Sequence, residues 1–352
     1  MNQTETESIG QAKLPLIRLS LAKPVVEEAE RRGVVVHDLL GDLALSRDAI
    51  FSPELFVPAP VMYSLLEALA QAADDPYLLA GIGESLDLST WPVFAEAVSG
   101  AGSVGDFFHL FTMAARKHAT SIRYELKTDG ADATFKAQRG FTPNMVPAQA
   151  DAFYAGMIYN IFRRAVGLDW DPQQVTITVC DLGSVPANYQ GMRLQQGGKS
   201  GPSIRFPMEW LLQPFRREPA SQEAQGSFLA PPSALISAMR ESLKPYLHLR
   251  NLSVAKAAEI CGFKERVLRR KLQGVGTSLS REIASLREQA AVRLLLETEK
   301  SIADIANAVG FGDPASFARS FRRWTGVSPQ QYRRKHRSES GRRNLPHRRP
   351  MP

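Results

Sequence analysis

An internal repeat in the last third of the chain constrains the fold more than any other feature of the sequence. Residues 253–263 (SVAKAAEICGF) and 301–311 (SIADIANAVGF) align without a gap at an offset of 48 residues. The pattern then continues at an offset of 49, where Leu268 matches Phe317 and Leu272 matches Phe321. Self-similarity at a fixed period predicts one structural unit that occurs twice.

The residues of each repeat follow the pattern of a helix-turn-helix. Ser253 and Ser301 are suitable N-caps for a short helix, and the alanine five residues later lets a second helix cross closely. A glycine then allows the positive φ of a tight turn, and the aromatic residue after it fills the angle between the helices. We therefore expect two helix-turn-helix motifs.

The second helix of each motif has an inward and an outward face. At roughly 100° per residue, the matched leucines and phenylalanines point inward. The outward faces carry guanidinium and hydroxyl groups, namely Arg266, Arg269 and Arg270 in the first helix and Ser316, Arg319, Ser320 and Arg323 in the second. One arginine stripe is usually solvated surface. Two stripes in register on a repeated helix-turn-helix favour the major groove of double-stranded DNA, where arginine pairs with guanine.

The segment between the motifs predicts a single amphipathic helix, Leu279–Glu297. Its apolar stripe consists of Leu279, Ile283, Leu286, Ala290 and Leu294. At 1.5 Å per residue this helix is roughly 28 Å long, close to the ~34 Å of one turn of B-DNA. A rod of that length would present both recognition helices to successive segments of the major groove.

With these residues in place, Ser253–Arg334 resembles the DNA-binding domain of the AraC/XylS family of bacterial transcription regulators. The resemblance spans about 80 residues and is carried by Ile302–Ala306, Gly310-Phe311, Phe317, Phe321–Pro329 and Tyr332-Arg333. It implies recognition helices at Lys264–Gln273 and Asp313–Trp324. It also implies base-reading positions at Arg266, Arg269, Arg270, Pro314, Ala315, Ser316 and Arg319, and we assign DNA phosphate contacts to Lys264, Lys271, Arg322 and Arg323.

The sequence departs from the family at two places in the recognition helices. Lys264 stands where the family usually has a cap such as Ser, and it cannot accept hydrogen bonds from the first backbone N–H groups. The second helix begins properly with Asp313 and Pro314, but Pro314 and Ala315 offer no hydrogen bond to a base. We therefore expect the first helix and Arg319 to dominate specificity, with Ala315 at most touching a thymine methyl group.

The part of the chain before this domain is expected to be α+β. Residues 121–127 and 133–138 alternate polar and apolar side chains around Asp129-Gly130, which predicts a β-hairpin. Residues 175–180 and 203–206 are further candidate strands, and residues 148–166 carry a helical apolar stripe. The predicted fold is thus an α+β domain followed by an all-α domain with two helix-turn-helix motifs joined by a long helix.

The sign of the net charge changes near the point where the α+β pattern gives way to the helical one. Of 43 basic and 36 acidic residues, 24 basic and 10 acidic ones lie from Ser233 onward, so the net charge of +7 combines a basic last third with an acidic remainder. We predict a disordered arm at 1–14, a sensing or dimerisation domain at 15–215, a linker at 216–232, the DNA-binding domain at 233–335 and a basic disordered tail at 336–352.

Residues 1–215 resemble, more weakly, the arabinose-binding-type sensing and dimerisation domain of one branch of the family. Asp75-Pro76 before an apolar helix and the closing segment 205–211 (RFPMEWL) carry this likeness. It implies effector binding or dimer formation. We therefore expect a sequence-specific regulator, an activator, whose first domain forms a homodimer, binds a small-molecule effector or does both, with RNA polymerase as a partner if it activates. An apolar effector would suit Phe107, Phe111, Tyr154 and Met157, although such a stripe is more often ordinary core.

Other function classes find little support in the sequence. Cys180 and Cys261 are too few for a disulfide framework or a cysteine-ligated metal cluster, and we expect no cofactor. The polar opening residues and the short apolar runs predict a cytoplasmic protein without a signal peptide or a membrane span. Gly197–Ser200 lacks the earlier glycine of a phosphate loop, and the sequence has neither a Gly-x-Ser-x-Gly nor a His-Glu-x-x-His motif. With no catalytic constellation in view, we expect no enzyme. A sequence-tolerant architectural DNA-binding protein and an effector-independent dimeric regulator remain as alternatives.

Overall fold

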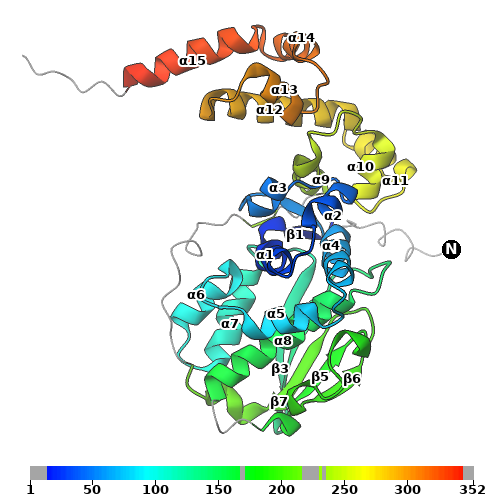
Figure 1. The fold of residues 1–352 in the computed structure, drawn as a ribbon, viewed down its shortest axis with the longest axis vertical. Coiled ribbons are helices and arrows are strands. Elements are labelled where there is room, and N and C mark those ends of the chain that lie inside the picture. Colours follow the sequence, from blue (N-terminus) through cyan, green and yellow to red (C-terminus); the bar gives the residue numbers. More distant parts are fainter. Residues whose placement is uncertain (1–13, 167–170, 216–229, 232–234, 344–352) are drawn as a thin grey trace, which may run out of the picture. The chain divides into compact units, whose positions relative to one another are not determined.

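The computed structural model describes residues 14–166, 171–215, 230–231 and 235–343 (Figure 1). The chain divides into two compact units, residues 1–242 and 243–352, which we describe separately. The first unit combines helices with a β-sheet and the second is helical. The predicted class, an α+β domain followed by an all-α domain, is confirmed.

The strands of the first unit form two sheets. β1 (Leu16–Arg18) pairs antiparallel with β2 (Phe56–Pro58). The second sheet has the order β3-β4-β7-β5-β6, and only its β5–β6 pair is parallel. Its strands are β3 (Ile122–Asp129), β4 (Asp132–Arg139), β5 (Thr176–Val179), β6 (Arg193–Gln196) and β7 (Ser203–Pro207).

The helices of the first unit are α1 (Lys23–Arg31), α2 (Val36–Asp42), α3 (Arg47–Phe51), α4 (Ala59–Ala72), α5 (Leu78–Ser85), α6 (Pro92–Gly100), α7 (Val104–Ala115), α8 (Ala148–Val166) and α9 (Leu235–Leu243), whose last residue belongs to the second unit. Of these helices, α7 packs against β3 and α8 against β5 of the five-stranded sheet (Figure 1). Short 3-10 helices are η2 (Leu19–Ala22), η4 (Pro172–Gln174), η5 (Leu182–Ser184), η6 (Tyr189–Gly191) and η7 (Met208–Leu212).

The β3–β4 hairpin follows the predicted pattern. Ile122 pairs with Arg139 and Asp129 with Asp132, and Gly130 in the turn has a φ of +59°. On β4 the apolar side chains Ala133, Phe135 and Ala137 are completely buried, whereas β3 keeps more exposed positions. Alternation of this kind gives the hairpin one face toward the core, and that face forms one wall of the pocket described below.

The second unit is built from helices in chain order. They are η9 (Lys244–Tyr246), α10 (Val254–Ile260), α11 (Glu265–Gly274), α12 (Leu279–Glu297), α13 (Ile302–Ala308), α14 (Pro314–Thr325) and α15 (Pro329–Arg343). The predicted long connecting helix has the expected bounds. The two predicted helix-turn-helix motifs are α10–α11 and α13–α14.

Several predicted boundaries differ from the structure. Leu14 is buried, so packing begins inside the predicted arm. The short strands β1, β2 and β6 were not predicted, because three or four residues without clear alternation give no periodic signal. The second unit begins at Leu243, not at 233, since the change in charge does not report which residues pack together.

The chain beyond residue 335 also differs from its prediction. α15 continues to Arg343, so residues 336–343 are helical and not disordered. Pro329 starts this helix, and its many arginine and lysine residues are good helix formers despite their charge. Residues 344–352 of the predicted tail, most of the predicted arm and residues 216–229 and 232 of the predicted linker lie outside the described residues.

Candidate nucleic-acid interface

The first helix-turn-helix is held by local hydrogen bonds that the repeat predicts. Ser253 caps α10 by accepting a hydrogen bond from the backbone N–H of Lys256. The chain turns at Gly262, whose φ is +67°. The backbone N–H of Phe263 then donates to the carbonyl oxygen of Ala258 at 2.8 Å. These bonds satisfy polar groups at both ends of α10 and lead the chain into α11.

The outward face of α11 carries the three arginines predicted to read DNA bases. Arg266, Arg269 and Arg270 are exposed, while Leu268 and Leu272 on the opposite side are buried. The burial of the two leucines fixes the rotation of the helix about its axis. The arginines are therefore held outward by packing on the other side of the same helix.

Glu265 is a neighbour of these arginines that was not among the predicted site residues. Its Oε1 accepts a hydrogen bond from Nη2 of Arg269 at 2.7 Å, one helical turn later. Both side chains are about half exposed, so the pair adds little to stability. It does hold Arg269 along the helix, so a base read by this arginine would have to compete with Glu265. Within the described part of the chain, Arg266 and Arg270 form no such pair. The i, i+4 spacing of Glu265 and Arg269 in the sequence is the signal that could have predicted this pair.

The four predicted phosphate contacts differ in exposure. Lys264, Arg322 and Arg323 are exposed, whereas Lys271 is half-buried. Lys264 is the N-cap of α11 and makes no side-chain cap hydrogen bond, as its chemistry predicts. The negative charge that the helix dipole favours at this end comes from Glu265 in the first turn.

The second helix-turn-helix repeats the construction of the first. Ser301 and Asp304 form a capping box at the start of α13. Gly310 has a φ of +78°. The backbone N–H of Phe311 donates to the carbonyl oxygen of Ala306 at 2.8 Å, the same bond at the same length as in the first motif. The structure thus shows that the repeated residues form the same turn twice.

The start of α14 is capped and its outward face is partly occupied by its own side chains. Asp313 Oδ1 accepts a hydrogen bond from the backbone N–H of Ser316 at 2.7 Å. Arg319 is exposed, and its Nη2 donates to Oγ of Ser316, which is half-buried, at 2.9 Å. Pro314 and Ala315 are exposed. The two polar side chains predicted to read bases on this helix are therefore bonded to each other.

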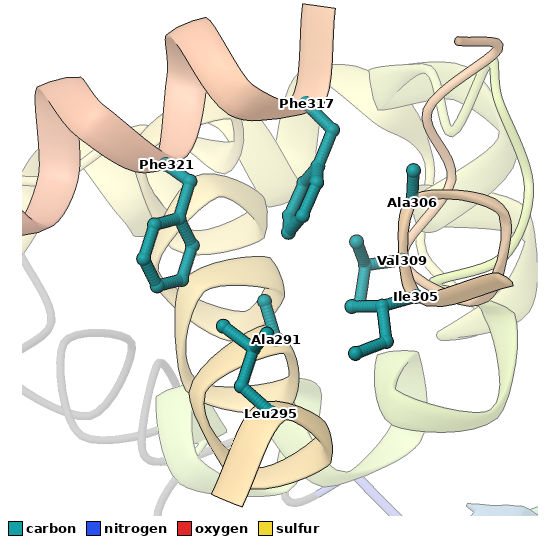
Figure 2. Packing of buried hydrophobic residues seen from close by; sticks show 7 residues of the cluster. All are labelled: Ala291, Leu295, Ile305, Ala306, Val309, Phe317 and Phe321. Carbon is teal, nitrogen blue, oxygen red and sulfur yellow. The ribbon is translucent and has the colours of Figure 1, made fainter. Parts of the chain in front are cut away.

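The inward face of α14 packs into an aromatic and aliphatic core (Figure 2). Phe317 and Phe321 point from α14 toward the side chains of α12 and α13, and both are completely buried. Their ring centroids lie 5.6 Å apart. The remaining buried members of this core are Ala291, Leu295, Ile305, Ala306 and Val309. The predicted inward positions of the second motif are thus buried.

The connecting helix α12 has two buried faces and not the single stripe that we predicted. Leu279, Ile283 and Leu286 are buried as expected. Farther along, the buried residues are Ala291 and Leu295, and the predicted Ala290 and Leu294 are only partly buried. The shift places the second half of the helix against the core of the second motif. A repeating stripe assumes one packing surface, whereas each half of α12 packs differently.

Arg287, in the middle of α12, bonds to the loop before the first motif and contacts the turn of the second. Its Nη2 donates to the carbonyl oxygen of Leu249 at 2.7 Å. Its guanidinium carbon lies 5.6 Å from the centre of the Phe311 ring, the aromatic residue of the second turn. Burial lowers the pKa of Arg287 below its usual value. This side chain therefore connects the loop before the first motif with the turn of the second.

The first unit contains a pocket of about 140 Å³ between α4, α7, α8 and the β3–β4 hairpin. Of the residues predicted to bind an effector, Phe111, Tyr154 and Met157 line this pocket. Phe107 is not among the lining residues. It is completely buried, with its ring stacked 4.8 Å from Phe215, centre to centre, so it belongs to the aromatic core.

The described residues contain no cluster of three or more His, Cys, Asp or Glu side chains that could hold a metal ion. Cys180 and Cys261 are separate buried thiols. The loop at Gly197–Ser200 joins β6 to β7, whereas a phosphate loop leads from a strand into a helix. In the described residues, no helix is both long and apolar enough to span a membrane.

Comparisons with known proteins agree with both units. Residues 257–335 match the sequence model of a helix-turn-helix domain, and residues 33–215 match that of the N-terminal arabinose-binding domain of AraC transcription regulators. The ornithine utilization regulator of Pseudomonas aeruginosa is 24% identical over 330 residues, which cover 84% of this chain and 93% of that protein.

Two further similarities come from a second curated protein and a solved structure. The transcriptional activator NphR of Rhodococcus sp. is 30% identical over 101 residues, which are 29% of this chain and 30% of that protein. The crystal structure of the transcriptional regulator CdpR from Pseudomonas aeruginosa is 21% identical and covers 78% of this chain and 91% of that chain, with a TM-score of 0.35. The matched families and proteins are regulators and not enzymes. Because the match to the arabinose-binding domain alone spans more than half of the residues, the chain belongs to the AraC family of transcription regulators.

Proposed function

We propose that this regulator recognises specific DNA sequences through α11 and α14. One observation carries the proposal. Both helices follow the same hydrogen-bonded turn, bury their apolar sides and expose arginines on the other side. An exposed arginine on a helix that enters the major groove can donate two hydrogen bonds to one guanine. The exposed Lys264, Arg322 and Arg323 would hold the adjacent phosphates.

The test is DNA binding by single alanine variants. A high-affinity site is first selected from random DNA with the wild-type protein. Arg266→Ala and Arg319→Ala are then expected to weaken binding to that site by about 1–3 kcal/mol each and to relax preference at the base each one contacts. Fluorescence anisotropy measures the affinity of each variant for the selected site and for random DNA. The salt concentration is kept fixed, because salt alone changes these affinities strongly.

Two controls separate sequence reading from general attraction to DNA. Arg163→Ala removes the same charge from an exposed position on α8 in the first unit and should leave binding unchanged. Deleting residues 344–352, which include Arg348 and Arg349, should weaken binding to all DNA to a similar extent. Equal losses on the selected site and on random DNA for Arg266→Ala and Arg319→Ala would contradict specific reading and favour an architectural protein.

The proposed assembly is a homodimer formed through the first unit. Met113 on α7 and Met208 and Leu212 on η7 are exposed apolar side chains, and Leu212 is 83% exposed. Exposed apolar groups on neighbouring elements are common at protein interfaces. Two linked copies would also raise the effective concentration of each DNA-binding unit at adjacent half-sites. Sedimentation equilibrium should show a dimer that Leu212→Asp converts to a monomer, and an unchanged mass would locate the interface elsewhere.

We further propose activation of transcription under the control of a small molecule bound in the first unit. The name of the relative NphR, a transcriptional activator, supports the direction of control. The pocket lined by Phe111, Tyr154 and Met157 supports a ligand. A promoter fused to a reporter gene should give more product with the protein than without it, through contact with RNA polymerase. Lower output would identify a repressor.

A further inference from the structure

The pocket of the first unit is small enough to limit what can occupy it. Its volume is about 140 Å³. A protein cavity of about 150 Å³ lined by apolar side chains holds one benzene molecule. Most of the lining is aromatic or aliphatic and includes Leu66, Phe111, Phe153 and Met157. An occupant of about one six-membered ring therefore fits. A sugar of the same size would bury several hydroxyl groups against carbon atoms, which is unfavourable.

The charged side chain at the wall of the pocket is already paired with protein atoms. Arg139 lines the pocket, and its Nη2 forms a buried ion pair with Asp151. The other two nitrogens of Arg139 donate to the hydroxyl of Tyr63 at 3.2 Å and to the carbonyl oxygen of Lys199 at 3.4 Å. The second oxygen of Asp151 accepts from the backbone N–H of Cys180 at 2.9 Å. A ligand carboxylate would have to displace one of these partners.

His118 adds no positive charge to the pocket near neutral pH. It lines the pocket, and its Nδ1 accepts a hydrogen bond from Nε of Arg18 at 3.1 Å. Burial, followed by the charge of Arg18, lowers the pKa of His118 to about 3. The imidazole is therefore neutral at pH 7. Because the remaining nitrogens of Arg18 donate to the carbonyl oxygens of Pro53 and Lys117, a neutral ligand suits this wall better than an anion.

Two lining residues have buried polar atoms without a partner in the described part of the chain. They are Oγ of Ser121 and Nε1 of Trp91. Ser121 is completely buried. A buried polar group without a hydrogen bond destabilises the folded protein. A ligand that supplies the missing hydrogen-bond partner removes this cost. The indole N–H only donates and the hydroxyl can donate or accept, so both are satisfied by an oxygen atom.

We propose that this pocket binds one neutral, single-ring molecule that carries a hydroxyl or carbonyl oxygen, such as a phenol, with Ser121 or Trp91 as its hydrogen-bond partner. The proposal rests on the effector control proposed above and names the chemical class of the effector. The ring of the ligand fills the empty volume between Phe111, Phe153 and Met157. Its oxygen forms the hydrogen bond that the buried polar atom of Ser121 or Trp91 lacks.

The test compares probes of similar size and different chemistry on the full-length protein. Phenol should bind with a stoichiometry of one per chain in calorimetry and raise the melting temperature of the first unit. Benzoate and L-arabinose at the same concentrations should bind at least tenfold more weakly. Tighter binding of benzoate or L-arabinose than of phenol would overturn the proposal, as would no detectable binding of phenol.

Two serine variants separate ligand contact from general structural effects. Ser121→Ala should lower the affinity for phenol about fivefold to tenfold, which corresponds to one hydrogen bond, and leave the affinity for toluene unchanged. Without ligand, this variant should melt at the same or a higher temperature, because it removes an unsatisfied group. Ser184→Ala is the matched control. The buried Ser184 hydroxyl donates to the carbonyl oxygen of Asp181 at 2.8 Å, so this variant should be less stable yet bind phenol normally.

A variant whose larger side chain fills the pocket, and an assay of DNA binding and reporter output, complete the experiment. Ala115 lines the pocket, and Ala115→Leu should abolish phenol binding while the protein still melts cooperatively. If phenol binds the wild-type protein but changes neither DNA affinity nor reporter output, the ligand class is supported and effector control is overturned. If reporter output responds to another small molecule and phenol does not bind, effector control stands and the ligand class is wrong.

Discussion

The repeat places Gly262 and Gly310 at equivalent turns. The same substitution at both positions therefore measures how much the atoms around each glycine add to the free-energy cost of an alanine there. Their φ values are +67° and +78°. An alanine in this left-handed region costs roughly 1–2 kcal/mol at either site. A Cβ atom at Gly262 would meet nothing within 4 Å. At Gly310 it would lie 2.5 Å from Nη2 of Arg287, 2.9 Å from the carbonyl oxygen of Leu249 and closer still to that of Leu247.

The crowding at Gly310 sets the expected difference in free energy. Relief requires the backbone at Leu247 to move, because its carbonyl oxygen is the nearest atom, and Arg287 to give up its 2.7 Å hydrogen bond to Leu249. Overpacking of this kind costs about 1–3 kcal/mol, and the loss of a hydrogen bond to a charged group costs about 1.5–3 kcal/mol. Together with the turn strain of roughly 1–2 kcal/mol, these costs sum to about 3.5–8 kcal/mol, so we expect Gly310→Ala to destabilise the second motif by at least about 3 kcal/mol. Gly262→Ala should destabilise the first by about 1–2 kcal/mol.

Hydrogen exchange of the full-length protein, read by mass spectrometry, reports each motif separately. Residues 301–325 in Gly310→Ala should lose protection by at least about a hundredfold, and residues 253–274 in Gly262→Ala by about tenfold, since about 1.4 kcal/mol corresponds to a factor of ten. The unmodified motif in each variant serves as the internal control. Equal losses in the two variants would show that turn strain alone matters, and the argument from Arg287 and the loop at 247–249 would then be wrong.

Three further changes test single features of the DNA-binding unit. Phe321→Ala should cost about 3–5 kcal/mol of stability in chemical unfolding, because the ring is completely buried, and a cost below about 1 kcal/mol would contradict the core described here. Lys264→Ser should stabilise α11 by about 1 kcal/mol through a new cap and weaken binding to all DNA equally; a loss confined to one sequence would make Lys264 a base-reading residue. The backbone N–H and hydroxyl of Ser316 lower the pKa of Asp313 below 3.8, so the cap stabilises α14 above that pH and is lost as the pH falls through the lower pKa of the folded state. Asp313→Asn should remove this acid sensitivity from the hydrogen exchange of residues 314–325.

The helix-turn-helix motifs were predictable because their signals are local. A serine N-cap, a glycine with positive φ and an aromatic residue act within a few residues of one another, and the repeat presents them twice. The same holds for the β3–β4 hairpin, whose alternation and turn glycine lie in one short segment. In each of these cases the sequence pattern and the local backbone energy favour the same conformation.

Features that depend on distant contacts were less predictable. The second buried face of α12 exists because Ala291 and Leu295 meet α13 and α14, which no periodicity within α12 reports. Phe107 and Phe111 lie one turn apart on α7, yet only Phe111 reaches the pocket, because Phe107 stacks against Phe215. The strand β6 is an edge strand with mostly exposed residues, so its position depends on pairing with β5.

The hydrogen bonds of the arginines refine where specificity on DNA originates. In the sequence alone, Arg266, Arg269 and Arg270 are equivalent candidates for reading bases, and Arg319 is a further one. In the structure, Arg269 is bonded to Glu265 and Arg319 to Ser316, so each must exchange an existing bond for a base contact. Arg266 and Arg270 are exposed without an ion pair in the described part of the chain. A hydrogen bond from either of them to a base therefore breaks no existing ion pair. We infer that α11 discriminates between bases more strongly than α14, and that Arg266 and Arg270 contribute most of this discrimination.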